Sequence, residues 1–206
     1  MYSLPYFKES DQNTILQFMR DNPFVVLCGT DKNGLPIATQ VPVFVDEKEG
    51  KIILSGHMMK NTDHHLAFAE NNDALALFTG AHCYVSASWY TEPKTASTWN
   101  YMSVHARGKM IFLDEAALLS VLKRTTDHFE NNEHSAAGFD QLPMDYVLKL
   151  SKAIVAFDIE VEDIQNVFKL SQNRDEKSCR NIIDKLEDMP DEGSRTIAAE
   201  MKKRLP

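Results

Sequence analysis

The chain has 206 residues, 43% of them apolar and 25% charged, which suits one domain with a buried core, with or without a small appendage. Acidic residues outnumber basic ones by 30 to 22 and the formal net charge is −8, so the overall charge disfavours attraction to DNA. No apolar run approaches the roughly 18–20 residues that span a bilayer, and the first residues do not resemble a signal peptide, so we expect no membrane association.

The three cysteines, Cys28, Cys83 and Cys179, lie far apart and form no CxxC motif. An odd number of isolated cysteines favours a reducing compartment over a disulfide scaffold. We therefore expect a cytoplasmic protein.

The first part of the sequence predicts a short helix followed by an antiparallel meander. Asp11 can cap a helix that ends near Asn22. The pair Asn33-Gly34 stands between two apolar runs and predicts a hairpin turn. Pro36 and Pro42 imply an edge or a bulge in the second strand of that hairpin.

A second short helix is predicted after the meander. Asn61 or Thr62 can cap it, and it would bury Leu66 and Phe68.

The remaining sequence alternates strand and helix patterns and becomes helical at its end. Strands are predicted at 74–80, 82–88, 99–113 and 153–164. Helices are predicted at 115–130, 143–151, 175–189 and 192–204.

Many short strands with inserted or appended helices are typical of a barrel decorated with helices, so we predict a mainly β fold with helices (α+β). The change of character at Asp175 divides the chain into a barrel domain, 1–174, and a C-terminal helical extension, 175–206, packed on the barrel or on a dimer.

The segment from Gly56 to Thr62 is the first candidate site, because it joins a strand end to a helix start. Free backbone N–H groups, the Thr62 hydroxyl and the Lys60 cation would suit a phosphate. The alternative is a capped surface helix with a solvated lysine.

Four large aromatic residues flank a polar loop and form the second candidate site: Trp89, Tyr90, Trp99 and Tyr101. Flat apolar faces with nearby hydrogen-bonding groups suit a planar heteroaromatic ligand. The alternative is that these rings belong to the barrel core and to dimer contacts.

The third candidate is the segment from Lys169 to Arg174. Its two cations could bind an anion, and Gln172 or Asn173 could hydrogen-bond a ring edge. The alternative is a polar connector.

No pattern indicates a metal site or a nucleophilic catalyst. His64-His65 and the His82-x-Cys83 pair lack a second pair at metal-ligand spacing. No G-x-S-x-G, G-x-G-x-x-G or P-loop motif is present, so no catalytic residue is assigned.

Four segments carry a resemblance to a known family. MYSLPYF, HCYVSASWY, TWNYMSVHARGK and KLSQNR stand in the order and at about the spacing of the PaiB-type family. That family is described as FMN-binding negative transcriptional regulators within the pyridoxamine-phosphate-oxidase-like split barrels. The resemblance runs from Met1 to about Arg174, and the final helices are also similar. It implies an FMN-binding split β-barrel with added helices and a helical C-terminus.

The resemblance also implies a homodimer with FMN between the subunits. By this resemblance, Lys60 and Thr62, with Asn61 between them, would hold the flavin phosphate, and Thr39 and Gln40 would face the ring or the ribityl chain. Trp99 and Asn100 would border the isoalloxazine. The residues that would close the site, from the partner chain, are Lys169, Gln172, Asn173 and Arg174.

The sequence departs from the family pattern near the expected phosphate. Lys60 stands where the family usually has Arg, and Thr62-Asp63 stands in place of an Asn-Pro pair. Lysine keeps the positive charge but cannot grip a phosphate in the bidentate way of arginine. Two prolines of the family pattern are replaced, by Ala87 and by Ser97.

The resemblance implies a negative regulator of transcription. Residues 175–206 contain 7 Lys/Arg (177, 180, 185, 195, 202, 203, 204) against 8 Asp/Glu (175, 176, 184, 187, 188, 191, 192, 200), whereas a recognition helix is normally basic. We therefore expect repression without direct DNA binding.

Two other functions stay open. One is a flavin-dependent oxidoreductase or flavin reductase, in which FMN carries the redox step. The other is a haem-binding split barrel, with His57, His65, His82 or His105 as an axial ligand.

Overall fold

The computed structural model describes residues 1, 4–92, 94–132 and 134–205. Within them the strands are β1 (Phe24–Thr30), β2 (Pro36–Lys48), β3 (Lys51–Met59), β4 (Asp73–Val85), β5 (Thr98–Phe112) and β6 (Ile154–Lys169). The α-helices are α1 (Gln12–Asp21), α2 (Asp63–Glu70), α3 (Glu115–Glu130), α4 (Met144–Ser151), α5 (Glu176–Glu187) and α6 (Glu192–Lys202). Short 3-10 helices are η1 (Pro5–Phe7), η2 (Ala87–Trp89) and η3 (Phe139–Gln141). Among the described helices, none combines the length and apolarity required to cross a membrane.

The strands close into a barrel in the order β1-β2-β3-β6-β5-β4, which confirms the predicted mainly β fold with helices. β1 and β2 pair antiparallel around the predicted turn, where Gly34 has φ 79°. β2 then pairs antiparallel with β3. Pro42 lies inside β2, opposite Phe24 of β1, so the hairpin accommodates a proline within its ladder.

The chain forms two compact units that the long strands share. The first unit comprises Met1–Asn22, Phe78–His105 and Gln165–Pro206, and the second comprises Pro23–Leu77 and Ala106–Ile164. β4, β5 and β6 each contribute residues to both units. The division at residue 174 was drawn where the sequence pattern becomes helical, not from contacts between residues, and it stays a prediction.

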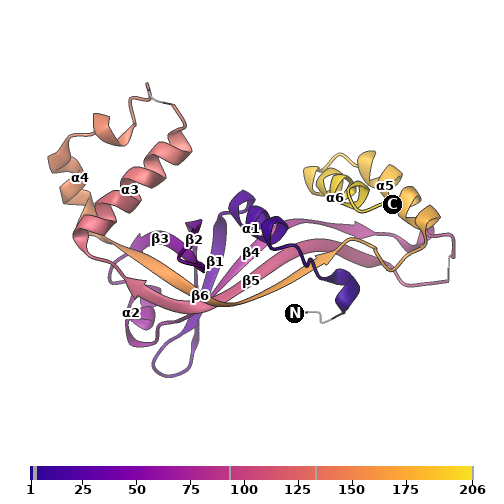
Figure 1. Ribbon diagram of the computed structural model, residues 1–206, viewed down its shortest axis with the longest axis horizontal. Helices are drawn as coiled ribbons and strands as arrows, with labels where there is room; N and C mark the ends of the chain where they lie inside the picture. The colour runs from indigo at the N-terminus through magenta and orange to yellow at the C-terminus, as the bar shows by residue number, and fades with distance from the viewer. Residues whose placement is uncertain (2–3, 93, 133, 206) are drawn as a thin grey trace. The chain divides into compact units, whose positions relative to one another are not determined.

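In the second unit, α2 lies close against β1. Phe68 is 1% exposed, and a Cβ added to Gly29 would come within 2.6 Å of its ring, so the close approach requires glycine. Leu66 is 53% exposed, so the prediction that it is buried was wrong. The helix turns Ala67 and Phe68 inward instead. α3 and α4 lie side by side in this unit (Figure 1).

In the first unit, α1 begins at the predicted cap, because the Asp11 carboxylate accepts a hydrogen bond from the Thr14 N–H at 2.9 Å. α5 and α6 lie side by side (Figure 1). α5 also packs against η2, and the Asn181 amide donates to the Trp89 carbonyl at 3.2 Å.

Three strand predictions were wrong in extent. The predicted strands 74–80 and 82–88 merge into one strand, β4, which continues through Gly80 and ends at Val85, and Ala87–Trp89 form the 3-10 helix η2 instead of strand. A Cβ at Gly80 would lie 2.6 Å from the Phe18 ring, so the close approach of that ring requires glycine. The strand predicted at 153–164 continues to Lys169, since backbone pairing extends it through a polar stretch that lacks a clear apolar pattern.

Candidate functional site

The segment predicted to hold a phosphate lies in the second unit and joins β3 to α2. Thr62 is the helix cap, and its hydroxyl oxygen accepts a hydrogen bond from the His65 N–H at 3.3 Å. Asn61 adopts the left-handed region, with φ 60°. The Lys60 N–H donates to the Ala153 carbonyl at 2.8 Å. Lys60 is half-buried as a residue, and within the described residues its ammonium group has no acceptor.

The side chains at the start of α2 interact with one another. The Asp63 carboxylate accepts a hydrogen bond from the His64 N–H at 2.8 Å and lies 3.1 Å from the His64 ring nitrogen. These contacts lower the pKa of Asp63. Burial, then the charges of His64 and Lys60, lower the pKa of His65. His65 is therefore neutral at pH 7 and accepts the Asn61 N–H at 3.2 Å.

Thr39 and Gln40 lie on β2 of the same unit, opposite Leu27 and Val26 of β1. Neighbouring residues of a strand point to opposite faces. Thr39 is half-buried and shares its face with the buried Val41, whereas Gln40 is exposed. One ligand group can therefore contact only one of these two side chains from a given face of the sheet.

Trp99 and Asn100 lie on β5 in the first unit and also point to opposite faces. Trp99 is 52% exposed, and its ring lies 6.1 Å from that of Tyr84 and 6.0 Å from that of His82. Asn100 is fully buried, and its amide donates to the Ser171 hydroxyl at 2.9 Å. The ring is thus available to a planar ligand, while the amide of Asn100 is engaged inside the protein.

Lys169 ends β6 in the same unit. Its ammonium group donates to the Thr98 hydroxyl and, at 2.9 Å, to the Trp99 carbonyl. Burial lowers the pKa of Lys169, and the nearby Arg174 charge adds to the effect. Lys169 therefore fixes the start of β5 as well as carrying charge.

The turn after β6 is held by its own side chains. The side-chain oxygen of Gln172 accepts the Leu170 N–H at 2.7 Å, and the side-chain amide nitrogen of Gln172 donates to the Phe168 backbone carbonyl. Ser171 has φ 62°, which is rare for serine, and Asn173 is exposed.

Arg174 lies over the Tyr90 ring, with 4.1 Å between the guanidinium carbon and the ring centroid. The hydroxyl of Tyr90 is buried and lacks a hydrogen-bond partner in the described chain. Arg174 is therefore oriented by stacking rather than by a carboxylate.

The predicted residues thus fall into two sets. Contacts within the first unit bring together Trp99, Asn100, Lys169 and the turn 172–174, and the second unit holds Thr39, Gln40 and 60–62. Ser171 lies in the predicted segment from Lys169 to Arg174, but the sequence analysis assigned it no role. Its hydroxyl joins β5 to the turn, and no sequence signal marks its positive φ. The described residues contain no group of three or more His, Cys, Asp and Glu side chains that could hold a metal ion.

FMN presents a dianionic phosphate and a planar ring. Within the second unit, Lys60 offers a cation that has no acceptor among the described residues, which suits a phosphate. Within the first unit, Trp99 offers an exposed aromatic side chain, which suits a planar ring. The buried amide of Asn100 fits a role in positioning the turn.

Comparison with known proteins agrees with this chemistry. Residues 1–163 match the family model described as "Putative FMN-binding domain". The chain is 33% identical over 205 residues to the protease synthase and sporulation protein PAI 2 of Bacillus subtilis, covering 100% of this chain and 98% of that protein.

Solved structures share the fold. A conserved hypothetical protein of Mycobacterium tuberculosis superposes with a TM-score of 0.59 at 11% identity, covering 84% of this chain and 92% of that one. The flavocytochrome Anf3 of Azotobacter vinelandii superposes with a TM-score of 0.57 at 18% identity, covering 82% and 72%. The expected split β-barrel is confirmed. The chain belongs to the PaiB-type family of proteins that carry this FMN-binding domain.

Proposed function

We propose that this protein is a cytoplasmic homodimer that binds FMN between its subunits and lowers transcription of target genes without contacting DNA itself. The single observation that carries the FMN proposal is the Lys60 ammonium group, which has no acceptor in the described residues and precedes the N-terminus of α2 in a domain of the FMN-binding family. A helix N-terminus beside a cation favours a phosphate electrostatically.

In this proposal Trp99 borders the isoalloxazine ring. Its exposed face can stack on a planar ligand, and Tyr84 and His82 extend the aromatic surface around it. FMN would supply redox chemistry to the site, while the residues of this chain bind and orient it.

The dimer follows from the family resemblance. Lys169, Gln172, Asn173 and Arg174 would close the flavin site of the partner subunit. Burial, and then the charge of Arg174, lowers the pKa of Lys169, so the two cations lie close to each other, as expected if they serve an anion.

Ion pairing on the last two helices supports repression without direct DNA contact. Arg180 pairs with Glu176 at 2.6 Å, and Lys202 pairs with Glu187 at 2.5 Å. Lys203 pairs with Glu200 at 2.6 Å. Basic side chains that already face carboxylates leave little positive potential for phosphates.

The proposal is tested by calorimetric titration of the purified full chain with FMN, FAD and riboflavin. We expect FMN to bind one molecule per subunit and more tightly than riboflavin, because only FMN carries the terminal phosphate. Absence of FMN binding would refute the cofactor assignment. A mobility-shift assay at low salt that gives tight, sequence-specific binding would refute indirect repression.

A haem-binding role is the second candidate, favoured by the structural similarity to a flavocytochrome. His57 is half-buried, and burial lowers its pKa, so its ring is neutral and can act as an axial ligand. A Soret band that forms on adding haem, and that His57→Ala removes, would support this candidate. No Soret band would eliminate it.

A further inference from the structure

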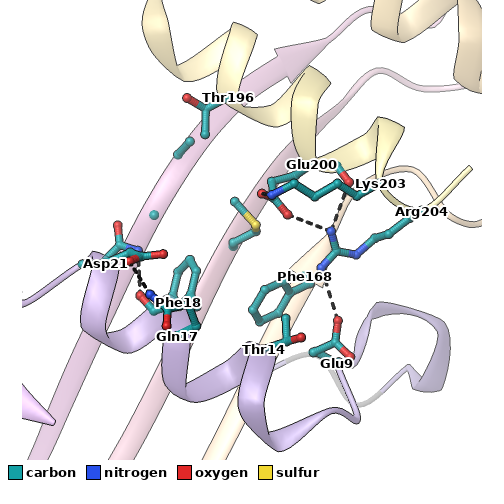
Figure 2. Close-up of a pocket in the computed structure, with 14 residues that line it drawn as sticks. Glu9, Thr14, Gln17, Phe18, Asp21, Phe168, Thr196, Glu200, Lys203 and Arg204 are labelled. Atoms are coloured by element: carbon teal, nitrogen blue, oxygen red, sulfur yellow. Dashed lines mark hydrogen bonds and ion pairs between the residues drawn. The ribbon is translucent and has the colours of Figure 1, made fainter.

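The first unit contains a cavity of about 620 Å³ that none of the predicted flavin residues lines. Residues of α1 and α6 face each other across it, above strand residues that form its floor (Figure 2). Its volume lies within the range of about 300–1,000 Å³ that small-molecule sites occupy.

The floor of the cavity is apolar and aromatic. Phe18 of α1 and Phe168 of β6 meet edge to face, with ring centroids 5.2 Å apart, and Met102 lies beside them. Gly80 lets the Phe18 ring lie directly on β4. Such a floor suits the hydrocarbon body of a ligand. The Arg204 guanidinium already lies over the Phe168 ring, 5.5 Å from its centroid, so the Phe18 side of the floor is the part left to a ligand.

At one end of the cavity the charges balance. Arg204 pairs with Glu200 of α6 at 2.8 Å and with Glu9, in the segment before α1, at 3.2 Å, and Lys203 pairs with Glu200 at 2.6 Å (Figure 2). Two cations and two carboxylates therefore neutralise one another, and this group offers no excess charge to a ligand.

Asp21, on the α1 side, is the charge left over. Its carboxylate accepts the Gln17 amide at 2.8 Å and, in the part of the chain that the structure describes, pairs with no cation. The neighbouring Arg20 does not line the cavity.

Asp21 is also the last residue of α1, whose C-terminal end carries a partial negative charge. A carboxylate there is unfavourable for the helix itself, so helix stability does not explain it. The helix end and the carboxylate together give the cavity a negative potential beside its aromatic floor.

We propose that this cavity binds a small organic monocation, an ammonium group on an apolar body, with the ammonium at Asp21 and the body against the apolar floor beside Phe18 and Met102. The single uncompensated carboxylate selects one positive charge and disfavours phosphates, so this site is separate from the proposed flavin site and goes beyond it.

The test uses phenethylamine and hydrocinnamate, which share a phenylethyl body and differ in the sign of their charge, in calorimetric titrations of the full chain. We expect phenethylamine to bind at one site per subunit and more tightly than hydrocinnamate. Asp21→Asn should weaken phenethylamine binding about fivefold, as expected for a partly exposed ion pair. Asp145→Asn, which removes an exposed acid from α4, should change nothing.

A steric variant separates this cavity from other acidic places on the surface. Thr196 is exposed on α6 and faces the cavity (Figure 2), so Thr196→Trp should fill the space and abolish binding while thermal melting stays unchanged. FMN should not compete with phenethylamine. Equal binding of the two probes, full binding to Asp21→Asn or Thr196→Trp, or displacement by FMN would overturn the proposal.

Discussion

Replacing Lys60 tests where the flavin phosphate binds. In Lys60→Met the cation is lost while much of the hydrocarbon stem is kept. Since the ammonium group has no acceptor in the described structure, its removal leaves no carboxylate behind without a partner. The loss should therefore fall on ligand binding rather than on folding.

The expected loss follows from the exposure of this side chain. A hydrogen bond to a charged group is worth about 1.5–3 kcal/mol, and a half-buried lysine belongs at the lower end, which weakens FMN binding roughly 10- to 30-fold. Lys60→Arg should tighten FMN binding, because a guanidinium group can contact a phosphate through two hydrogen bonds.

Titrations monitored by flavin fluorescence give the dissociation constants. Riboflavin is the internal control, because it lacks the phosphate and should bind Lys60→Met as it binds the unaltered protein. Lys152→Met, at an exposed position, is the matched control variant. An equal loss for FMN and riboflavin, or no loss for either, would refute a phosphate contact at Lys60.

Three further predictions concern stability. Gly108→Ala should destabilise the fold by about 3 kcal/mol in urea unfolding, because the added Cβ would lie 2.0 Å from the Glu160 carbonyl oxygen. Asn100→Ala should lose about 2 kcal/mol in the same assay, since it leaves a buried hydroxyl without its partner. The Ser178 hydroxyl and N–H lower the pKa of Asp175 from 3.8 to about 2, so its stabilisation is present above pH 3.8 and lost as the pH falls toward 2. The free energy of unfolding of Asp175→Asn should therefore lie below that of the unaltered protein above pH 3.8, and the difference between the two should shrink as the pH falls toward 2.

Each stability prediction has a control or a contradicting result. Gly34→Asn is the control for Gly108, because its positive φ tolerates asparagine and nothing lies within 4 Å of an added Cβ. An Asn100→Ala protein as stable as the unaltered one would show that the buried amide is not structural. A stability difference for Asp175→Asn that does not change with pH would contradict the assigned pKa.

The local signals in the sequence predicted much of the fold. The Asp11 cap, the Asn33-Gly34 turn and the alternation along β5 depend on neighbouring residues, and all three occur as expected. The errors arose where tertiary packing decides. The pattern places a strand end at Gly80, yet β4 continues through it, and the glycine is required there because the Phe18 ring packs against its Cα. Leu66 was predicted to be buried from its apolar side chain alone, because the sequence does not show which face of α2 meets β1.

The candidate site was predictable only as a set of segments. Residue type and spacing identified Lys60 and Thr62, but not that the Thr62 hydroxyl lies 3.0 Å from the His64 ring. The family pattern predicted Asn100 as a ligand contact, whereas its side chain is buried and its amide donates a hydrogen bond to the Ser171 hydroxyl. The cavity between α1 and α6 joins residues from both ends of the chain, so no local pattern could reveal it.

Sedimentation velocity of the purified full chain with FMN, recorded at the absorption of the flavin, tests the central proposal most directly. It reports on the cofactor and on the assembly together. We predict that the flavin absorbance sediments with a species of twice the 23.4 kDa chain mass. Flavin that does not sediment with the protein would contradict the cofactor assignment, and flavin that sediments with a single chain would contradict a site built from two subunits.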